Sequence, residues 1–400
     1  MVIFEALNAL YGDCLILRYE DPKKAKRVWI IDGGPRNTAV GGKTVSVWKD
    51  VLLPRLQQIS STKPFKVDLG MVSHIDDDHI NGIERLTDEL VHALPHPGDV
   101  AFRRFWFNSF DEIVGPAPAG QVESSGALAL KLSTAAAGLL PEGGFSPDGE
   151  AVIQSIPQGN KLAASLRSLK LQGNDPLGGL IAARAGQTGI DIDGATVTVI
   201  GPLQTRLDAL REKWRKALEA TSESARVAAL QGLFATELDT SVPNLSSIVV
   251  LVEVSGKSLL LTGDARGDDI VAGWEQLKLP DSARKLDLIK MPHHGSFANS
   301  SQEFLQFFEA EHYVFSADGH YENPDPPVVE GLISIHSKRS VVLHFTNSNI
   351  TWKKLYKLAK GGAQVSTLTD LLVALQAAYP GPWKWQFRPS NSLSVEIAIE

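Results

Sequence analysis

Three apolar stretches of this chain each lead into a short polar segment that is rich in histidine and aspartate. The first leads into residues 73–82, where two histidines and three aspartates lie within six residues. The second leads into residues 261–265, which contain Asp264, and the third into residues 290–296, which contain a pair of histidines. Buried strands of α/β proteins commonly carry functional side chains at their carboxyl ends. The pattern therefore predicts an α/β fold with a polar site at these strand ends.

The composition is that of a soluble globular protein. The chain has 400 residues, of which 43% are hydrophobic and 21% are charged. This length allows a large buried core, and this balance excludes wholesale disorder, a collagen-like repeat or a coiled coil. The single cysteine, Cys14, excludes a disulfide framework and a cysteine-rich zinc module. A metal site in this chain must therefore use histidine, aspartate and glutamate.

The charge balance bears on partners and location. There are 46 acidic and 39 basic residues, for a formal net charge of −7, which leaves no general electrostatic attraction for nucleic acid. We find no run of 18 or more apolar residues and no secretory signal. We therefore expect no membrane association and a cytoplasmic location.

Hydrophobic periodicity divides the chain into strand-rich parts and an insertion. Residues 1–94 and 195–350 carry the apolar strands, whereas residues 95–194 are rich in Pro, Gly, Ala and Ser and form a long insertion. Residues 351–400 are expected to form a C-terminal extension that packs on the main domain. The expected strands cover residues 14–19, 28–31, 67–73, 195–202, 247–254, 258–262, 286–291, 313–316 and 340–345. The expected helices include residues 48–59, 126–140, 161–172, 207–218, 224–234 and 268–277.

The charge density of residues 73–82 favours a bound cation. Carboxylates and imidazoles crowded into one loop cost desolvation and mutual repulsion, which a cation relieves. Each polar segment alone has another explanation. The aspartates could cap a helix, Asp264 could be an N-cap, and the two histidines could be a surface feature. Together, however, the three segments supply enough nitrogen and oxygen ligands for two divalent ions.

These segments resemble motifs of the metallo-β-lactamase superfamily. The first metal motif of that superfamily is H-x-H-x-D-H, and this chain has H-x-D-x-D-H with Asp76 in place of the middle histidine. That variant is similar to the soluble hydrolase domain of ComEC-type competence proteins and to related phosphorylcholine esterases. Five further segments agree in order, and the resemblance covers residues 1–90 and 195–345. These segments are residues 10–17, 30–34, 244–249, 261–265 and 293–296.

The resemblance implies a four-layer αββα sandwich, with the long insertion added, and a dinuclear metal site. In that site His74 and Asp76 bind one metal ion. Asp78 and His79 bind the other, and Asp264 bridges the two.

The resemblance also assigns roles around the two ions. His293 and His294 supply a further ligand and a proton donor to the leaving group, and which does which stays open. Asp32 orders the ligand loop without binding metal, whereas Asp77 faces solvent or supports the ligands. We expect Asp78, Asp264 and His294 to take part in catalysis. Zinc is the first choice of metal, and manganese is the alternative because Asp76 shifts the ligand set toward oxygen.

Two features depart from the family pattern. The ComEC-type stretch Y-G-H-P is matched here by residues 321–324, with Asn323 in the place of the histidine. Asn323, Asp325, His320 and His344 are the candidates to complete the site. The histidine of the family's third motif is also missing before Asp264.

The resemblance implies a metal-dependent hydrolase that cleaves phosphodiester bonds, in the manner of a nuclease, with a hydroxide that bridges the two metals. The expected substrate is a nucleic acid or a small phosphodiester. The alternatives are a hydrolase of a small phosphodiester or lactone, and a catalytically silent partner protein with the same fold. The insertion at 95–194 is expected to cover the site as a lid or to bind a protein partner.

Overall fold

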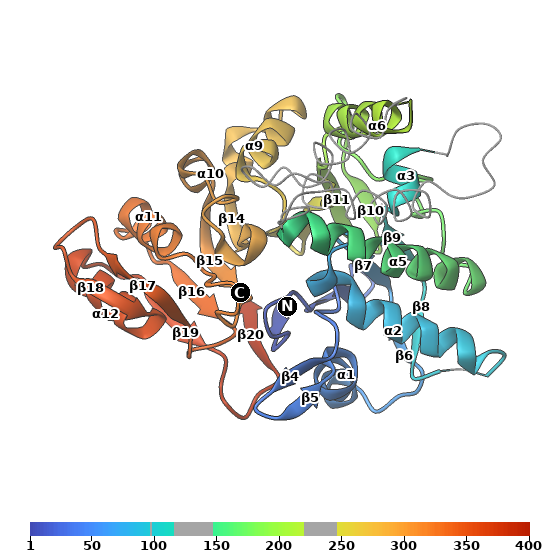
Figure 1. Cartoon of the computed structure of the whole chain (residues 1–400), viewed down its shortest axis with the longest axis horizontal. Coiled ribbons are helices and arrows are strands. Elements are labelled where there is room, and N and C mark those ends of the chain that lie inside the picture. Colours follow the sequence, from blue (N-terminus) through green and yellow to red (C-terminus); the bar gives the residue numbers. More distant parts are fainter. Residues whose placement is uncertain (97, 116–146, 220–245) are drawn as a thin grey trace.

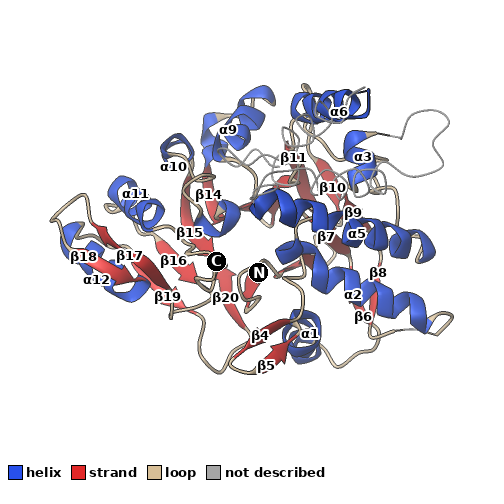
Figure 2. Cartoon of the chain, in the orientation of Figure 1, coloured by secondary structure: helices blue, strands red, loops and turns tan. Residues whose placement is uncertain are grey.

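The computed structural model describes residues 1–96, 98–115, 147–219 and 246–400. This part of the chain is a mixed α/β structure built on two large β-sheets (Figure 1), with helices outside them (Figure 2). The expected helices at residues 126–140 and 224–234 lie outside the described residues.

One sheet has six strands in the order β20-β1-β2-β3-β7-β9. Most of its pairs are antiparallel, whereas β7 runs parallel to both of its neighbours, β3 and β9. The predicted strands at 14–19 and 28–31 are confirmed as β2 and β3. The strands of this sheet are β1 (Val2–Leu7), β2 (Leu15–Glu20), β3 (Lys26–Ile31), β7 (Leu69–Val72), β9 (Phe105–Phe107) and β20 (Ser394–Ile399).

The other sheet has eight strands in the order β10-β11-β12-β13-β14-β15-β16-β19. The first four pair in antiparallel fashion and the rest are parallel. The predicted strands at 247–254 and 258–262 are confirmed as β12 and β13, which form a hairpin whose turn places Ser255 and Gly256 at positive φ. The strands of this sheet are β10 (Ile190–Ile192), β11 (Ala195–Gly201), β12 (Val249–Val254), β13 (Lys257–Leu261), β14 (Lys285–Lys290), β15 (Glu309–Phe315), β16 (Val342–Phe345) and β19 (Lys384–Phe387).

The main core lies between the two sheets. Alternate residues of a strand point to opposite faces of its sheet, so each sheet presents one apolar face to the other. Phe4, Trp29 and Met71 of the first sheet belong to the same buried cluster as Val197 and Val252 of the second. This shared cluster holds the two sheets face to face.

The outer faces of the sheets are covered by helices (Figure 2). Ile16, Ile30 and Val72 of the six-stranded sheet pack with one set of helices, and Leu251, Ile289 and other residues of the eight-stranded sheet pack with the second set. The first set is η1 (Val47–Leu52), α1 (Leu53–Ile59), α2 (Asp77–Ala93), α3 (Phe110–Val114), α5 (Pro147–Ser168) and α6 (Gln204–Glu219). The second set is α9 (Gly267–Gln276), α10 (Gln302–Phe307), α11 (Pro326–His336) and α12 (Leu368–Ala378).

The predicted helix at 48–59 differs from the structure in one respect. The segment is a π-helical turn, η1, that passes directly into α1. Pro54 lies in the first turn of α1, and a proline has no N–H to donate to the preceding turn. The hydrogen-bond pattern therefore changes at this point.

The described part of residues 95–194 contributes to the core. Phe105, Trp106 and Phe107 are buried in β9 at the edge of the six-stranded sheet, and α5 packs beside α2. The last residues add β19 to one sheet and β20 to the other. The division into a main domain, an insertion at 95–194 and a C-terminal extension at 351–400 stays a prediction.

Smaller two-stranded sheets and two 3₁₀ turns complete the described part. Over these residues, we find no helix long and apolar enough to cross a membrane. The small elements are β4 (Thr38–Val40), β5 (Lys43–Val45), β6 (Phe65–Val67), β8 (Val100–Phe102), β17 (Thr351–Lys357), β18 (Gln364–Thr367), η2 (Asp281–Arg284) and η3 (Pro292–Gly295).

Candidate metal centre

The polar segments follow β7, β13 and β14, as the sequence predicts. His74 lies in the loop after β7, and Asp78 and His79 lie in the first turn of α2. Asp264 follows β13 by three residues. His293 and His294 lie in η3, directly after β14.

These side chains converge around the carboxylate of Asp264. Asp264 Oδ1 is 3.2 Å from His79 Nε2, and Asp264 Oδ2 is 3.5 Å from His293 Nε2 and 3.7 Å from His294 Nε2. Asp78, His79, Asp264 and His294 each offer a ligand atom, and these atoms lie within 4.8 Å of one another. That spacing is close enough for one cation to contact several of them.

His74 and Asp76 extend the cluster on one side. His74 Nε2 is 3.6 Å from Asp76 Oδ2 and 3.9 Å from Asp264 Oδ2. The two oxygens of Asp264 therefore face different histidines, His79 from Oδ1 and His74 from Oδ2. The structure thus brings together all seven residues that the sequence singles out as metal ligands.

Buried polar atoms of this cluster have no hydrogen-bond partner among the described residues. They are His74 Nε2, Asp76 Oδ1, His79 Nε2 and Asp264 Oδ1. A buried polar atom that makes no hydrogen bond costs about 1–3 kcal/mol, and four in one place are rare in a folded protein. Imidazole nitrogens and carboxylate oxygens are also the ligands that divalent ions use. The donor set therefore fits a metal centre.

The charges of the cluster shift the pKa values of its members in opposite directions. Burial alone would lower the pKa of His79, but the carboxylates of Asp264, Asp78 and Asp32 raise it well above its usual range. Burial would raise the pKa of Asp264, but the nearby histidines hold it well below. Burial raises the pKa of Asp76. The site strongly favours positive charge among its carboxylates, and a bound cation supplies such charge.

Asp32 positions the loop that carries the first ligands. Its carboxylate accepts hydrogen bonds from the backbone N–H of Ser73 at 2.7 Å and from Ser73 Oγ at 2.8 Å. It also lies 2.9 Å from His79 Nδ1. Because a carboxylate only accepts, Nδ1 carries the hydrogen and Nε2 of His79 is presented to the cluster.

Sequence reasoning missed a buried ion pair beneath the cluster. Asp13 and Lys290 are both fully buried, and Lys290 Nζ contacts Asp13 Oδ2. Asp13 Oδ1 lies 3.3 Å from His294 Nδ1, which also donates to the Ser316 carbonyl at 2.7 Å. The sequence did contain a signal for this pair: Asp13 and Lys290 each adjoin an apolar strand. A charged residue that is buried beside such a strand needs a partner of opposite charge.

Asn299 supports the same cluster and was also missed. Its side-chain Nδ2 donates to the carbonyl of Asp264 at 2.9 Å, and its Oδ1 lies 2.9 Å from His293 Nδ1. It thereby ties the loop after β13 to the loop after β14. Nothing in its sequence surroundings marks it out.

Two glycines allow the loops to meet. A Cβ on Gly12 would lie 1.9 Å from the carbonyl oxygen of Asp78, and one on Gly82 would lie 1.9 Å from that of Gly33. Side chains at these positions would push α2 away from the β1–β2 and β3 loops. The close approach of backbone at these glycines is what brings Asp13, Asp32 and the first turn of α2 into one site.

Other polar residues near the motifs point elsewhere. Asp77 accepts hydrogen bonds from Arg36 Nε at 2.7 Å and from Asn81 Nδ2 at 2.8 Å. Asn323 Nδ2 is 3.5 Å from the carbonyl of His293, and Asp325 Oδ2 accepts from the N–H of Phe297. The remaining candidates contact other rings: His320 stacks on Tyr11, and His344 lies beside His312.

The pair of histidines on β15 and β16 predicts a pH effect on stability. Burial lowers the pKa of His344 to about 3, assisted by His312. The folded state therefore binds fewer protons at His344 than the unfolded state, whose pKa is about 6.5. Stability from this residue is present above about pH 6.5 and is lost as the pH falls toward 3, by at most about 1.4 kcal/mol per pH unit.

Urea unfolding of the wild type and of His344→Gln between pH 7 and 4 measures this contribution. The difference in unfolding free energy between the two proteins should shrink as the pH falls. A constant difference across that range would contradict the assignment.

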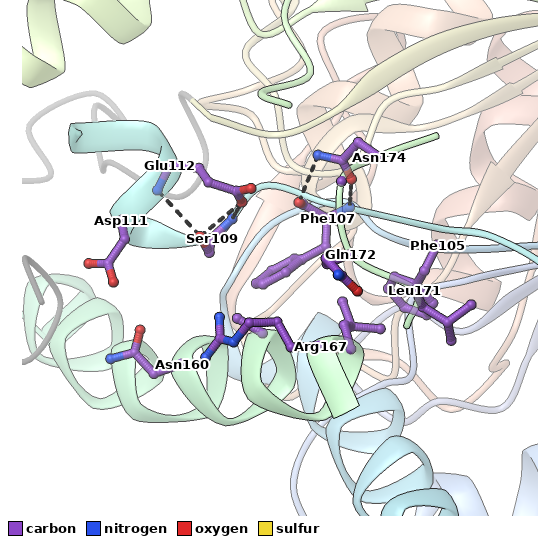
Figure 3. A pocket seen from close by; sticks show the side chains of 13 residues that line it. Phe105, Phe107, Ser109, Asp111, Glu112, Asn160, Arg167, Leu171, Gln172 and Asn174 are labelled. Atoms are coloured by element: carbon purple, nitrogen blue, oxygen red, sulfur yellow. Dashed lines mark hydrogen bonds between the residues drawn. The ribbon is translucent and has the colours of Figure 1, made fainter. Parts of the chain in front are cut away.

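One hollow in the described part lies away from the cluster. It has a volume of about 470 Å³ and lies between α3, β9, α5 and residues 171–174 (Figure 3). Figure 3 shows Asn160 and Arg167 of α5 on one side and Asp111 and Glu112 of α3 on the other. No residue of the histidine and aspartate cluster lines it, so the two features are separate.

Comparison with known proteins gives one similarity in sequence. Over 121 residues the chain is 32% identical to ComE operon protein 3 of Bacillus subtilis. The matched segment makes up 30% of this chain and 15% of that protein. The chain therefore matches only a small part of the relative's length. No family model matches. A protein of unknown function from Enterococcus faecalis covers 98% of this chain at 10% identity, and 89% of that structure is aligned, with a TM-score of 0.30.

Proposed function

We propose that this protein is a metal-dependent hydrolase of the metallo-β-lactamase type that cleaves phosphodiester bonds. The observation that carries the proposal is the convergence of buried histidine and aspartate atoms, several of them without hydrogen-bond partners, from three strand ends. The partial similarity to ComE operon protein 3 supports it. So do the two facing sheets with helices outside, the arrangement expected of an αββα sandwich.

The distances support the proposed division of ligands. His74 and Asp76 lie together beside Asp264 Oδ2, and His79 lies beside Asp264 Oδ1. With Oδ1 toward His79 and Oδ2 toward His74, Asp264 would contribute one oxygen to each of two ions. Asp78 joins the His79 side, where its Oδ1 is 3.9 Å from His79 Nε2.

The residues after β14 complete the proposed site. His294 Nε2 is 3.1 Å from Asp78 Oδ2, and His293 Nε2 faces Asp264 Oδ2. His294 is buried, whereas the His293 side chain is 30% exposed. We assign His294 as the ligand and His293 as the proton donor to the leaving group, because a donor must reach a substrate that enters from solvent.

When bound, two divalent ions lower the pKa of coordinated water and stabilise the attacking and leaving oxygens of a displacement at phosphorus. The chain's own residues hold the geometry. Asp32 and Asp13 fix the orientation of His79 and His294, and Asn299 fixes that of His293. Zinc is the proposed metal and manganese the alternative, since the set mixes imidazole with carboxylate.

Metal content and turnover test the proposal together. We expect about two equivalents of zinc or manganese per chain by elemental analysis. We also expect hydrolysis of bis-p-nitrophenyl phosphate that is lost on dialysis against a chelator and restored by the metal. A panel of single-stranded DNA, double-stranded DNA, RNA, cyclic nucleotides and lactones then identifies the substrate class.

The outcomes separate the alternatives. A protein that binds no metal would be the catalytically silent form of the fold. A protein that binds metal and opens lactones while leaving every diester intact would be a lactonase. Either result would overturn the phosphodiesterase proposal. The role of residues 95–194 as a lid or partner-binding segment stays a prediction.

A further inference from the structure

The exposed aromatic side chains of the described residues gather around the metal centre. Within residues 1–96, 98–115, 147–219 and 246–400, large apolar side chains that are exposed include only two aromatic ones, Phe297 at 63% and Tyr321 at 64%. Phe297 follows His294 by three residues, and Tyr321 lies in the loop after β15 that also carries Ser316. Exposed aromatic groups that cluster at a site, rather than scatter, mark a binding surface.

Tyr321 belongs to a packed group of three rings. Tyr11 and His320 are stacked, with centroids 4.9 Å apart and planes 27° apart. Tyr321 stands edge-on to both, at 5.4 Å from Tyr11 and 4.7 Å from His320. We call these three residues the aromatic platform. Because the rings hold one another, Tyr321 is presented to solvent in a defined orientation.

The platform adjoins the metal centre directly. Tyr11 is two residues from Asp13, and its hydroxyl lies 3.5 Å from Asp77 Oδ2, in the first turn of the helix that carries Asp78. The loop of Tyr321 and the loop of Phe297 are joined as well. The N–H of Asp325 donates to the carbonyl of Gly295, and the N–H of Phe297 donates to Asp325 Oδ2.

A cation lies beside the platform. Arg36, whose side chain is 51% exposed, binds Asp77 through Nε, and Tyr11 contacts the same carboxylate. Surfaces that bind single-stranded nucleic acid combine aromatic rings, on which bases stack, with positive charge that follows the backbone. Here such a ring group lies next to a centre proposed to act on phosphodiesters, and the nearby Arg36 guanidinium is paired with Asp77.

Resting on the proposed function, we infer that the aromatic platform stacks against a nucleobase of the substrate, so that the substrate is an unpaired strand of nucleic acid or a nucleotide diester. The ring geometry favours a base over a quaternary ammonium group. A cage for such a cation needs electron-rich faces on several sides. The stacked pair of Tyr11 and His320 leaves no space between its rings, and an imidazole face is a poor partner for a cation.

Paired substrates with and without a base test the inference. The substrates are the dinucleoside phosphate of thymidine and the same diester with one base replaced by hydrogen. We expect Tyr321→Ala to lower kcat/KM on the thymidine compound at least about fivefold, which corresponds to the lower end of the free energy measured for stacking one base on an aromatic ring. On the abasic compound the same variant should lower kcat/KM less than about twofold. Tyr321→Phe should behave as the wild type. Val373→Ala, which removes an equally exposed apolar side chain on α12, should change neither.

Direct binding keeps the inference distinct from the proposed function. A single-stranded DNA carrying 2-aminopurine should lose fluorescence on binding the wild type and Tyr321→Phe, and keep it with Tyr321→Ala. If no diester is hydrolysed but this quenching occurs, the platform stands and the proposed reaction fails. Equal effects of Tyr321→Ala on both diesters, or quenching that survives it, would overturn the platform. If Tyr321→Ala selectively lost hydrolysis of p-nitrophenyl phosphorylcholine, that result would also overturn the base-stacking role of the platform.

Discussion

Replacing Asp264 by alanine should abolish turnover of bis-p-nitrophenyl phosphate, with a loss of more than about 10³-fold in kcat/KM. Asp264 lies between His79 and His74, and each of its oxygens faces one of them. Its removal takes away a shared ligand and a negative charge from both halves of the proposed centre. Elemental analysis of the purified variant should show at least one metal equivalent fewer than in the wild type.

Asp77→Ala is the matched control. Asp77 lies on the same loop–helix junction, but its carboxylate binds Arg36 and Asn81 and does not face the cluster. We expect less than about a tenfold change in kcat/KM and unchanged metal content. Comparable losses in the two variants would mean that the carboxylates facing the metals are misassigned.

Replacing Lys290 by methionine should destabilise the protein by about 3–5 kcal/mol, because it leaves a buried carboxylate without its cation. Asp13 and Lys290 are each within 1% of complete burial. The unfolding free energy of metal-free protein in urea measures this cost. The double variant Asp13→Asn, Lys290→Met should regain a large part of the loss, since no unpaired charge then remains.

An exposed ion pair provides the control for Lys290. Lys63 binds Asp99 at 2.5 Å, with side chains that are 62% and 41% exposed. Lys63→Met should change the unfolding free energy by less than about 1 kcal/mol. If Lys290→Met cost no more than Lys63→Met, or if the double variant were less stable than Lys290→Met alone, the buried pair would not hold the site as we describe.

The sequence by itself determined the strands that lead to the metal-binding candidates and the positions of these candidates along the chain. It did not predict β1, β9, β10, β19 or β20 of the two large sheets. Alternating or continuous apolar runs mark β2, β3, β12 and β13 because burial of a strand face is a local property of the sequence. The polar residues that end β7, β13 and β14 follow from the same pattern. Since functional side chains gather at strand ends, residues such as Asp264 could be placed in one site before any distance was known.

Only the tertiary structure decided which polar residues support or surround that site. Asp13 and Lys290 lie far apart in the sequence, and their pairing depends on how the two sheets face each other. Asp77 and Asp78 are neighbours, but the first turn of α2 points one toward Arg36 and the other toward His294. Tyr11 meets Tyr321 only because loops from different sheets touch. Such contacts depend on long-range packing and side-chain direction, which local periodicity does not encode.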